Sequence, residues 1–326
     1  MDIPVSIART VVLQFSSLPT PTTDCSGKTV IVTGANGGLG LETARHFVRL
    51  NAARVIMGCR NLEKAEAAKA DIESTTGRPG VLDIWSIDLT SFDSVKDFCA
   101  RAADLDRLDI VVENSGIAPY KPLYAEGYES QITVNVISTA LMALKLLPVL
   151  RRTSTKYNVE PHLVIVSSDA HRFVTWPIMR QHDNFFEACR TDKMFHERYS
   201  ISKLFEIFFV NELAQAMDRS GKSSVIVNTA HPGLCSSDLF HELPAFMTWI
   251  LNGIMLLFSR TCEQGARNFV HAALLPNTHG AYISECKPAE TSARTRDELG
   301  VKTQKQVYKE LMEMLEKIEP GISANI

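Results

Sequence analysis

The sequence predicts an α/β fold in which one doubly wound parallel sheet is covered by helices on both faces. Two observations lead to this prediction. Short apolar runs rich in β-branched residues alternate along the chain with amphipathic stretches, and nearly continuous apolar strands are typical of sheets buried on both faces. The 326 residues, of which 45% are hydrophobic, also suffice for one large domain with a sizeable core, and no repeat or linker divides them.

The expected elements follow one another in a regular order. Strands are predicted at 29–34, 53–59, 81–90, 108–114, 162–168 and 223–233, because each is a β-branched run bounded by turn residues. Helices are predicted at 39–51, 61–74 and 91–104, with a charged helix at about 302–318. Right-handed crossovers between such strands produce a parallel sheet. We therefore expect an N-terminal extension at 1–26 and a single domain at 27–326, with insertions at 169–197 and 238–260.

Charge and cysteine content exclude several classes of protein. The net charge of -3 provides no basic surface for nucleic acid. The seven cysteines are scattered, without CxxC or Cys/His spacing, so neither a disulfide framework nor a metal site is predicted. Reduced thiols favour an intracellular protein, and we expect a cytoplasmic location.

Two apolar segments bear on the question of membranes. The segment 1–24 is mildly hydrophobic, but Arg9 interrupts it, and it lacks the charged start, apolar run and cleavage site of a signal peptide. The segment 243–259 carries no charge but is shorter than the roughly 20 residues of a spanning helix. A buried or lid-forming helix is the favoured interpretation, and contact with a membrane surface is the alternative.

A glycine-rich turn joins the first predicted strand to the first predicted helix. In TGANGGLG, Gly34, Gly38 and Gly40 have the spacing TGxxxGxG. Glycine permits a tight turn and lets a pyrophosphate approach the backbone, while the free N–H groups from Leu39 onward stabilise the anion. With Asn36 in the same turn, these residues are predicted to bind a dinucleotide.

The end of the second predicted strand indicates which dinucleotide binds. NAD sites carry an acidic residue there for the ribose hydroxyls, whereas a 2′-phosphate favours arginine. This strand ends with Cys59 and Arg60 and has no carboxylate. Arg60 therefore favours NADP (NADPH), because its guanidinium can pair with the phosphate; the alternative is that Arg60 only faces solvent.

The stretch HERYSISKLFE places Tyr199 and Lys203 four positions apart, on one face of a helix. A free phenol titrates near pH ~10, and a neighbouring cation lowers its pKa. The pair fits an acid–base device, although a Tyr-x-x-x-Lys pattern alone also arises by chance.

Together these segments resemble the short-chain dehydrogenase/reductase family in its compact, single-domain branch, which has a Rossmann-like fold. The likeness covers about residues 27–237 and rests on TGANGGLG, Asp88–Leu89, ENSG at 113–116, VNVIS with Asn135, IVSS ending at Ser168, YSISK and HPG. GCRN and the C-terminal part resemble retinol-dehydrogenase-like members. The proline-rich leader resembles fungal enzymes of secondary-metabolite biosynthesis.

The resemblance implies a role for each matching residue. Tyr199 would exchange a proton with the substrate oxygen, and Lys203 would bind the nicotinamide ribose and lower the Tyr199 pKa. Ser168 would hydrogen-bond the carbonyl, and Asn135 would hold a water that relays protons through Lys203. The implied cofactor contacts are Asp88 and Leu89 at the adenine, Asn114 and Gly116 at the adenosine ribose, and Pro232, Gly233, Leu234 and Ser237 at the nicotinamide. Two hydroxyl donors suit the negative charge that a carbonyl oxygen gains during reduction.

Two departures from the family pattern stand out. Glu113 replaces an asparagine and adds a charge near the adenosine half, so cofactor affinity or the hydrogen bonds at the strand end are expected to differ. The interval from Ser168 to Tyr199 is longer than usual and carries aromatic residues and histidines. Ser167 competes with Ser168 for the catalytic role, and Ser168 is preferred by the motif. Dispersed histidines such as His171, His182 and His196 are interpreted first as packing or surface residues.

The predicted function is NADP(H)-dependent reduction of a ketone or aldehyde, or oxidation of an alcohol, on a bulky hydrophobic molecule of secondary metabolism. The insertions are apolar, as suits such a substrate; their large side chains are Phe173, Trp176, Phe185, Phe186, Phe240, Phe246, Trp249, Leu256, Leu257 and Phe258. Packing against the sheet or a dimer contact is the alternative for these residues. The rival functions are a membrane-associated retinoid or lipid dehydrogenase and a non-catalytic dinucleotide sensor. Homo-oligomers are common in the family, but the sequence identifies no interface.

Overall fold

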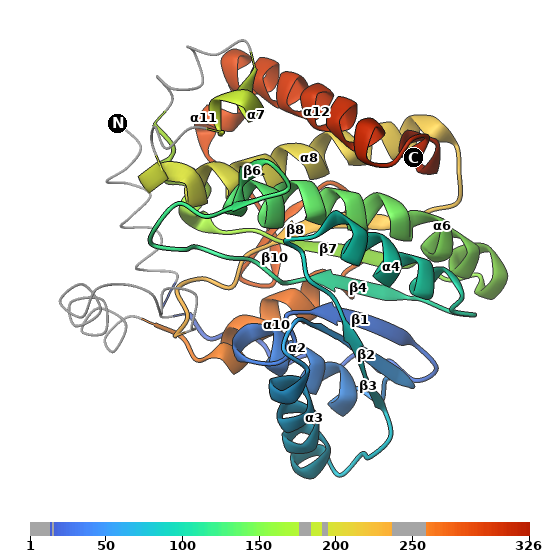
Figure 1. The fold of residues 1–326 in the computed structure, drawn as a ribbon. Helices are drawn as coiled ribbons and strands as arrows, with labels where there is room; N and C mark the ends of the chain where they lie inside the picture. The colour runs from blue at the N-terminus through green and yellow to red at the C-terminus, as the bar shows by residue number, and fades with distance from the viewer. Residues whose placement is uncertain (1–13, 15, 176–183, 191–194, 237–258) are drawn as a thin grey trace.

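The centre of the molecule is an eight-stranded sheet with the strand order β10-β9-β8-β7-β4-β1-β2-β3 (Figure 1). The computed structural model describes residues 14, 16–175, 184–190, 195–236 and 259–326. The strands are β1 (Thr29–Thr33), β2 (Arg54–Cys59), β3 (Leu82–Ser86), β4 (Ile110–Glu113), β7 (His162–Val166), β8 (Ile226–Ala230), β9 (Tyr282–Ser284) and β10 (Lys287–Ala289). Neighbours are parallel except β9 and β10. The predicted doubly wound parallel fold is confirmed.

The strand order locates the ligand-binding edge. The chain runs outward from β1 through β2 to β3 and then crosses to β4 on the other side of β1. In such sheets ligands bind beyond the carboxyl ends of the strands at this switch point. The glycine turn follows β1 and the segment Asn114–Gly116 follows β4, so the topology brings these two predicted cofactor-binding segments together.

A short hairpin closes one edge of the sheet. β9 continues the parallel arrangement beside β8, and β10 turns back against it, with Pro288 opposite Ile283. These two strands are not among the predicted ones, because each has only three residues and neither shows a β-branched run.

One face of the sheet is covered by α4 (Phe92–Ala103), α6 (Thr139–Tyr157) and α8 (Arg198–Ser220), and α12 (Glu298–Ile318) packs against α8 (Figure 1). The stretch preceding α6 contains α5 (Ser130–Ile132) and a π-helical segment, η1 (Thr133–Ser138). Among the described residues, the combined stretch Ser130–Tyr157 is the one helix long and apolar enough to cross a membrane, but 89% of its apolar window is buried inside the protein. It is therefore explained as a core helix.

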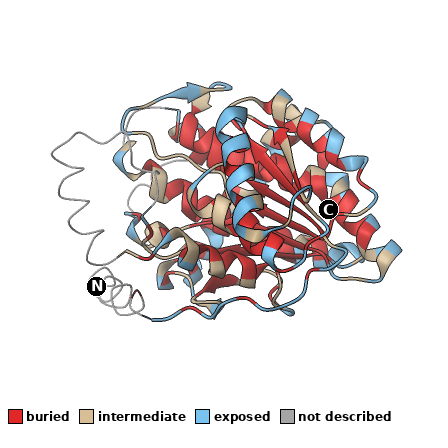
Figure 2. Cartoon of the chain, turned by 90° about the horizontal axis from the view of Figure 1, so that it is seen from below, coloured by how far each residue is buried: buried red, intermediate tan, exposed pale blue. Residues whose placement is uncertain are grey.

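The other face is covered by α2 (Gly38–Arg49), α3 (Leu62–Thr76) and α10 (Cys262–Ala272). Two apolar cores result, one on each side of the sheet. Figure 2 shows the buried strands between helices whose outer faces are exposed. This alternation explains why the strands are apolar runs while α2 and α4 are amphipathic.

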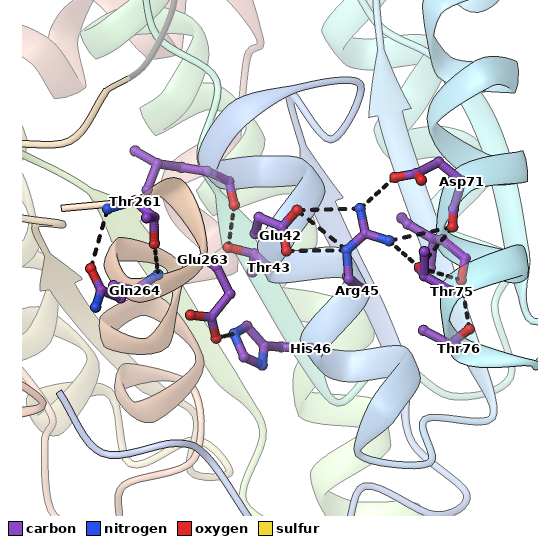
Figure 3. Close-up of polar contacts among 12 residues, drawn as sticks. Glu42, Thr43, Arg45, His46, Asp71, Thr75, Thr76, Thr261, Glu263 and Gln264 are labelled. Atoms are coloured by element: carbon purple, nitrogen blue, oxygen red, sulfur yellow. Dashed lines mark hydrogen bonds and ion pairs between the residues drawn. The ribbon is translucent and has the colours of Figure 1, made fainter.

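Helix α2, which begins at the glycine turn, is held from both sides by polar contacts (Figure 3). On one side Arg45 lies 2.6 Å from Asp71 of α3 and also pairs with Glu42. On the other side His46 Nε2 lies 3.1 Å from Glu263 of α10. These contacts fix the helix whose N-terminus faces the switch point.

The remaining described elements are short. They are the hairpin β5 (Tyr124–Ala125) and β6 (Tyr128–Glu129), η2 (Asp169–Phe173), α7 (Phe185–Ala188), η3 (Phe195–Glu197), α11 (Ala293–Arg296) and η5 (Ile322–Asn325). Three of them, η2, α7 and η3, lie in the insertion predicted at 169–197. The insertion at 238–260 is described only at residues 259 and 260.

Candidate active site

The turn after β1 has a backbone that only glycine accommodates. Gly34 and Gly38 have φ angles of +66° and +54°, which L side chains rarely adopt. A Cβ on Gly40 would lie 2.2 Å from the carbonyl oxygen of Gly34. The first turn of α2 carries no acidic residue, so its N-terminus favours an anion. The turn, which also contains Asn36 and Leu39, fits the pyrophosphate of a dinucleotide.

Asn114, directly after β4, binds this turn from the neighbouring strand. Its Nδ2 donates to the carbonyl oxygen of Thr33 at 2.9 Å, and its backbone N–H donates to the Thr33 hydroxyl at 3.0 Å. The Asn114 side chain therefore holds the turn. Its contact with the adenosine ribose, like that of Gly116, stays a prediction.

The other predicted cofactor residues lie at the expected strand ends. Arg60 is exposed directly after β2. Asp88 lies in the loop after β3, where its Oδ1 accepts hydrogen bonds from the backbone N–H and hydroxyl of Thr90. The strand predicted at 81–90 is thus too long at its C-terminal end, because Asp88 closes a turn with Thr90. Leu89 is buried, at 6% exposure.

Helix α8 carries Tyr199 and Lys203, the predicted proton-transfer pair. The Lys203 ammonium lies 5.8 Å from the centre of the Tyr199 ring. It donates to the carbonyl oxygen of Val166 at 2.9 Å and to Glu206 Oε1 at 2.8 Å. Lys203 is 4% exposed, so both contacts are in the protein interior, and the ammonium is paired with a carboxylate as well as lying near the phenol.

The net shift in the pKa of Tyr199 differs from the one expected for an isolated Tyr–Lys pair. Burial raises the pKa of Tyr199 above its ordinary value, and the Lys203 ammonium opposes this rise without cancelling it. The prediction that Lys203 lowers the Tyr199 pKa therefore holds for the contribution of Lys203 but not for the net shift. Burial also lowers the pKa of Lys203, but Glu206 and Tyr199 outweigh it, and the net shift is upward. Lys203 is thus charged at neutral pH.

The two candidate serines have different environments. Ser167 is 2% exposed and donates to the carbonyl oxygen of Lys203 at 2.8 Å, so it anchors α8. The Ser168 hydroxyl hydrogen-bonds Tyr199 and lowers its pKa, and it also accepts from the backbone N–H of Ala170. Of the two, Ser168 is the serine beside the phenol.

Asn135 lies in the π-helical segment η1 and is fully buried. Its Oδ1 accepts from the backbone N–H of Ile117, and its Nδ2 donates to the Ile117 carbonyl oxygen and to the Ser202 hydroxyl. Both amide donors are therefore used inside the protein. A Cβ on Gly116 would lie 3.4 Å from Asn135 Oδ1 and 3.5 Å from the Lys203 nitrogen, so these groups surround Gly116.

The loop after β8 is held by the N-terminal segment. Gly233 has a φ of +78°. The Gln14 side chain accepts from the Leu234 N–H at 3.0 Å and donates to its carbonyl oxygen at 2.5 Å. Pro232, Gly233 and Leu234 thus form a braced loop, whereas Ser237 lies outside the described residues.

The insertion residues separate into two groups. Phe185 and Phe186 are buried and lie 6.4 and 5.5 Å from the ring of Phe205, so they pack in the core, which is the alternative stated for them. Phe173 is 42% exposed. The residues outside the described part are Trp176, Phe240, Phe246, Trp249, Leu256, Leu257 and Phe258.

Of the three histidines in the insertion at 169–197, the two that the structure describes are a packing residue and a surface residue, as expected. His171 is buried, with a pKa of about 4 because of burial, and it accepts from the backbone N–H of Ser292. His196 is exposed. His182 lies outside the described residues.

Two residues at the site are not among the predicted ones. Glu206 follows Lys203 by three positions in YSISKLFE, an i,i+3 spacing that signals an ion pair on a helix. Gln14 is distant in sequence from the loop it binds, and no local pattern indicates such a contact. Glu113, noted for its charge, is buried at the end of β4, and burial raises its pKa well above the ordinary value.

Comparison with known proteins places these residues in context. The sequence profile described as short chain dehydrogenase matches residues 28–177. A protein of Cryptosporiopsis sp. (strain 8999), described as short chain dehydrogenase/reductase dmxR8, is 40% identical over 319 residues, which cover 95% of this chain and 97% of that protein.

Solved structures share the fold at lower identity. A proposed short chain dehydrogenase from Pseudomonas syringae is 21% identical, with a TM-score of 0.59 over 81% of this chain and 96% of the other. A second from Shigella flexneri 2A str. 301, crystallised with NADP, is 21% identical, with a TM-score of 0.51 over 74% of this chain and 89% of the other.

Proposed function

This chain belongs to the short-chain dehydrogenase/reductase family, and we propose that it is an NADP(H)-dependent oxidoreductase acting on a bulky hydrophobic small molecule. It would reduce a ketone or aldehyde, or oxidise the corresponding alcohol. One observation carries the proposal. The Lys203 nitrogen lies 3.5 Å from the position of a Cβ on Gly116, two residues after the Asn114 that holds the glycine turn. Lys203, which would act with Tyr199 in proton transfer, thus lies near the strand end that holds the glycine turn, which supports the proposal.

The residues of the site suit the movement of one proton. The bound nicotinamide would supply or accept the hydride. In reduction, Tyr199 would donate its phenol proton to the carbonyl oxygen, and the Ser168 hydroxyl would stabilise the negative charge that develops there. Lys203 would stabilise the resulting phenolate. In oxidation the same phenolate would accept the alcohol proton.

The proposed cofactor is NADP(H). The glycine turn and the N-terminus of α2 would hold the pyrophosphate. Arg60, exposed at the end of β2 where no carboxylate follows, would pair with the 2′-phosphate. The NADP bound to the Shigella flexneri protein supports this choice in a protein of the same fold.

The proposed substrate is apolar, and the proposed setting is secondary-metabolite biosynthesis in the cytoplasm. Phe173, an apolar residue of the insertion in η2, is 42% exposed, which supports an apolar substrate. The chain is similar to a fungal dehydrogenase over most of its length, which supports a role in fungal metabolism. Nucleic acid is not a proposed partner.

The test follows NADPH absorbance against a panel of hydrophobic ketones, aldehydes and alcohols. Tyr199→Phe should lower turnover by about 100-fold or more while NADPH still binds. Tyr157→Phe, on the surface end of α6, is the matched control and should leave turnover unchanged. Full turnover by Tyr199→Phe would refute the proton-transfer role. A wild-type protein that binds NADPH without any turnover would instead be a sensor, and partition onto liposomes would indicate a membrane-associated enzyme.

A further inference from the structure

A buried carboxyl pair lies behind the proton-transfer lysine. Glu206, on α8, is 3% exposed, and Glu113, the last residue of β4, is 2% exposed. Glu113 is opposite Ile165 in the sheet register and two residues after Val111, and both apolar residues belong to the core beneath α8. Because alternate residues of a strand share a face, Glu113 points into this helical layer.

The two carboxyl groups have different partners. Glu206 Oε1 accepts a hydrogen bond from the Lys203 ammonium at 2.8 Å. Both Glu113 oxygens are buried and have no hydrogen-bond partner among the described residues. An isolated carboxylate is far costlier to bury than a neutral acid. Burial therefore raises the pKa of Glu113, and the nearby Glu206 charge raises it further. Lys203 and Glu206 are the ion pair, and Glu113 is a neutral acid beside it.

The charge of Glu206 also reaches the catalytic phenol. It raises the pKa of Tyr199, against the effect of Lys203. Burial raises the pKa of Glu206 itself to about 7, although Lys203 acts against this rise. As Glu206 loses its proton near neutral pH, its new negative charge offsets Lys203, and the phenol holds its proton more tightly. When Glu206 is protonated, the full positive charge of Lys203 favours the phenolate.

We propose that Glu206 is a positioning residue for the reaction proposed above, which this inference presupposes. It holds the Lys203 ammonium and, through its charge, sets the pH range in which Tyr199 exchanges a proton. Glu113 remains protonated beside it. Neither carboxyl group touches the substrate; both act through Lys203 and Tyr199.

The Ser167 side chain hydrogen-bonds Glu206 and lowers its pKa, whereas the other polar groups around α8 are engaged elsewhere. From η2, Asp169 pairs with Arg172 and accepts from the Tyr282 hydroxyl. From α12, Gln304 binds Glu212, farther along α8. From η1, Asn135 binds Ser202. The charged and titratable groups that act on Glu206 are accordingly Lys203 and Tyr199 on its own helix and Glu113 from β4.

The first experiment measures the pH profile of kcat/KM for alcohol oxidation, in which the phenolate is the base. Glu206→Gln removes a charge that lies within about 9 Å of the centre of the Tyr199 ring, because Lys203 Nζ is 2.8 Å from Glu206 Oε1 and 5.8 Å from that centre. At an effective dielectric of about 20, the acidic limb should move down by about one pH unit. Glu212→Gln, a buried glutamate on the same helix, is the matched control and should not move it. Glu206→Asp, which keeps the charge, should restore the wild-type profile.

A second readout needs no turnover and so separates this inference from the proposed activity. Tyrosinate absorbance is titrated in each protein and in its Tyr199→Phe derivative, and the difference reports Tyr199 alone. The midpoint should fall in Glu206→Gln even if no substrate is found. A folded Glu206→Gln protein with the wild-type midpoint overturns the proposal.

Should Glu206→Gln fail to fold, infrared spectra of the wild type decide the matter. A protonated carboxyl band should persist above neutral pH and vanish in Glu113→Gln, while a second carboxyl band titrates near neutrality in both proteins. If neither band is present, the carboxyl pair does not hold its proton as proposed, and the inference is wrong.

Discussion

The buried acid at the end of β4 makes a quantitative prediction about stability. Glu113 has two buried oxygens without hydrogen-bond partners, and burial raises its pKa well above the ordinary value of 4.5. The folded chain therefore keeps this proton in a pH range where the unfolded chain releases it. Since the folded state binds the extra proton, the free energy of unfolding falls as pH rises above the ordinary value.

Replacing the acid by its neutral isostere, Glu113→Gln, removes this dependence. One proton corresponds to a slope of about 1.4 kcal/mol for each pH unit. At a pH two units above the ordinary pKa, the free energy of unfolding of the variant should therefore have gained up to about 2.7 kcal/mol relative to wild type. With an unfolding entropy of about 2.1 cal/mol/K per residue over 326 residues, the relative gain in Tm of the variant is about 4 °C.

The assay compares thermal midpoints of the two proteins from mildly acidic to mildly basic pH, with identical buffers and scan rates. The midpoint of Glu113→Gln should rise relative to wild type with increasing pH and approach it in acid. Glu66→Gln, at an exposed position of α3, supplies a matched control whose curve should run parallel to wild type. Parallel curves for Glu113→Gln as well would refute the assignment of a neutral acid at this position.

Three further changes test the cofactor site, each measured by NADPH fluorescence or initial rates. Gly40→Ala should weaken NADPH binding by about tenfold or more, because its Cβ would lie 2.2 Å from the Gly34 carbonyl oxygen. Gly37→Ala, whose Cβ would have nothing within 4 Å, is the control and should bind NADPH normally. Equal losses of affinity in the two variants would count against the tight turn. Arg60→Glu should raise KM for NADPH more than for NADH, because it replaces the proposed phosphate partner with a repelling charge, and equal effects would exclude that contact. Gln14→Ala should weaken NADPH binding about three- to tenfold, since two hydrogen bonds to Leu234 are lost; unchanged affinity would mean that the loop after β8 needs no brace.

The fold was predictable where burial leaves a local pattern. β1 and β2 lie within one residue of the predicted bounds, because strands covered on both faces are apolar throughout. α6 is buried nearly all round and has a proline at position 148, so it lacks the periodicity that predicts a surface helix. β9 and β10 are too short for any periodic signal.

The site was predictable where its residues form contiguous motifs. The glycine turn and the Tyr199–Lys203 spacing are visible in the sequence, and their environment is not. The net pKa of Tyr199 depends on burial and on Glu206 as well as on Lys203. Likewise Phe185 and Phe186 look like lid residues in a list of aromatics, and only their packing against Phe205 shows that they belong to the core.

The hairpin at the end of the sheet has a consequence for self-association. Its outer strand, Lys287–Ala289, is exposed at Lys287 and Pro288. Proline offers no N–H to a strand from another molecule. The charged lysine beside it also disfavours pairing with the edge strand of another sheet. This border is therefore a poor template for strand addition, and copies of the chain that assemble would meet through their helical surfaces instead of extending the sheet across that border.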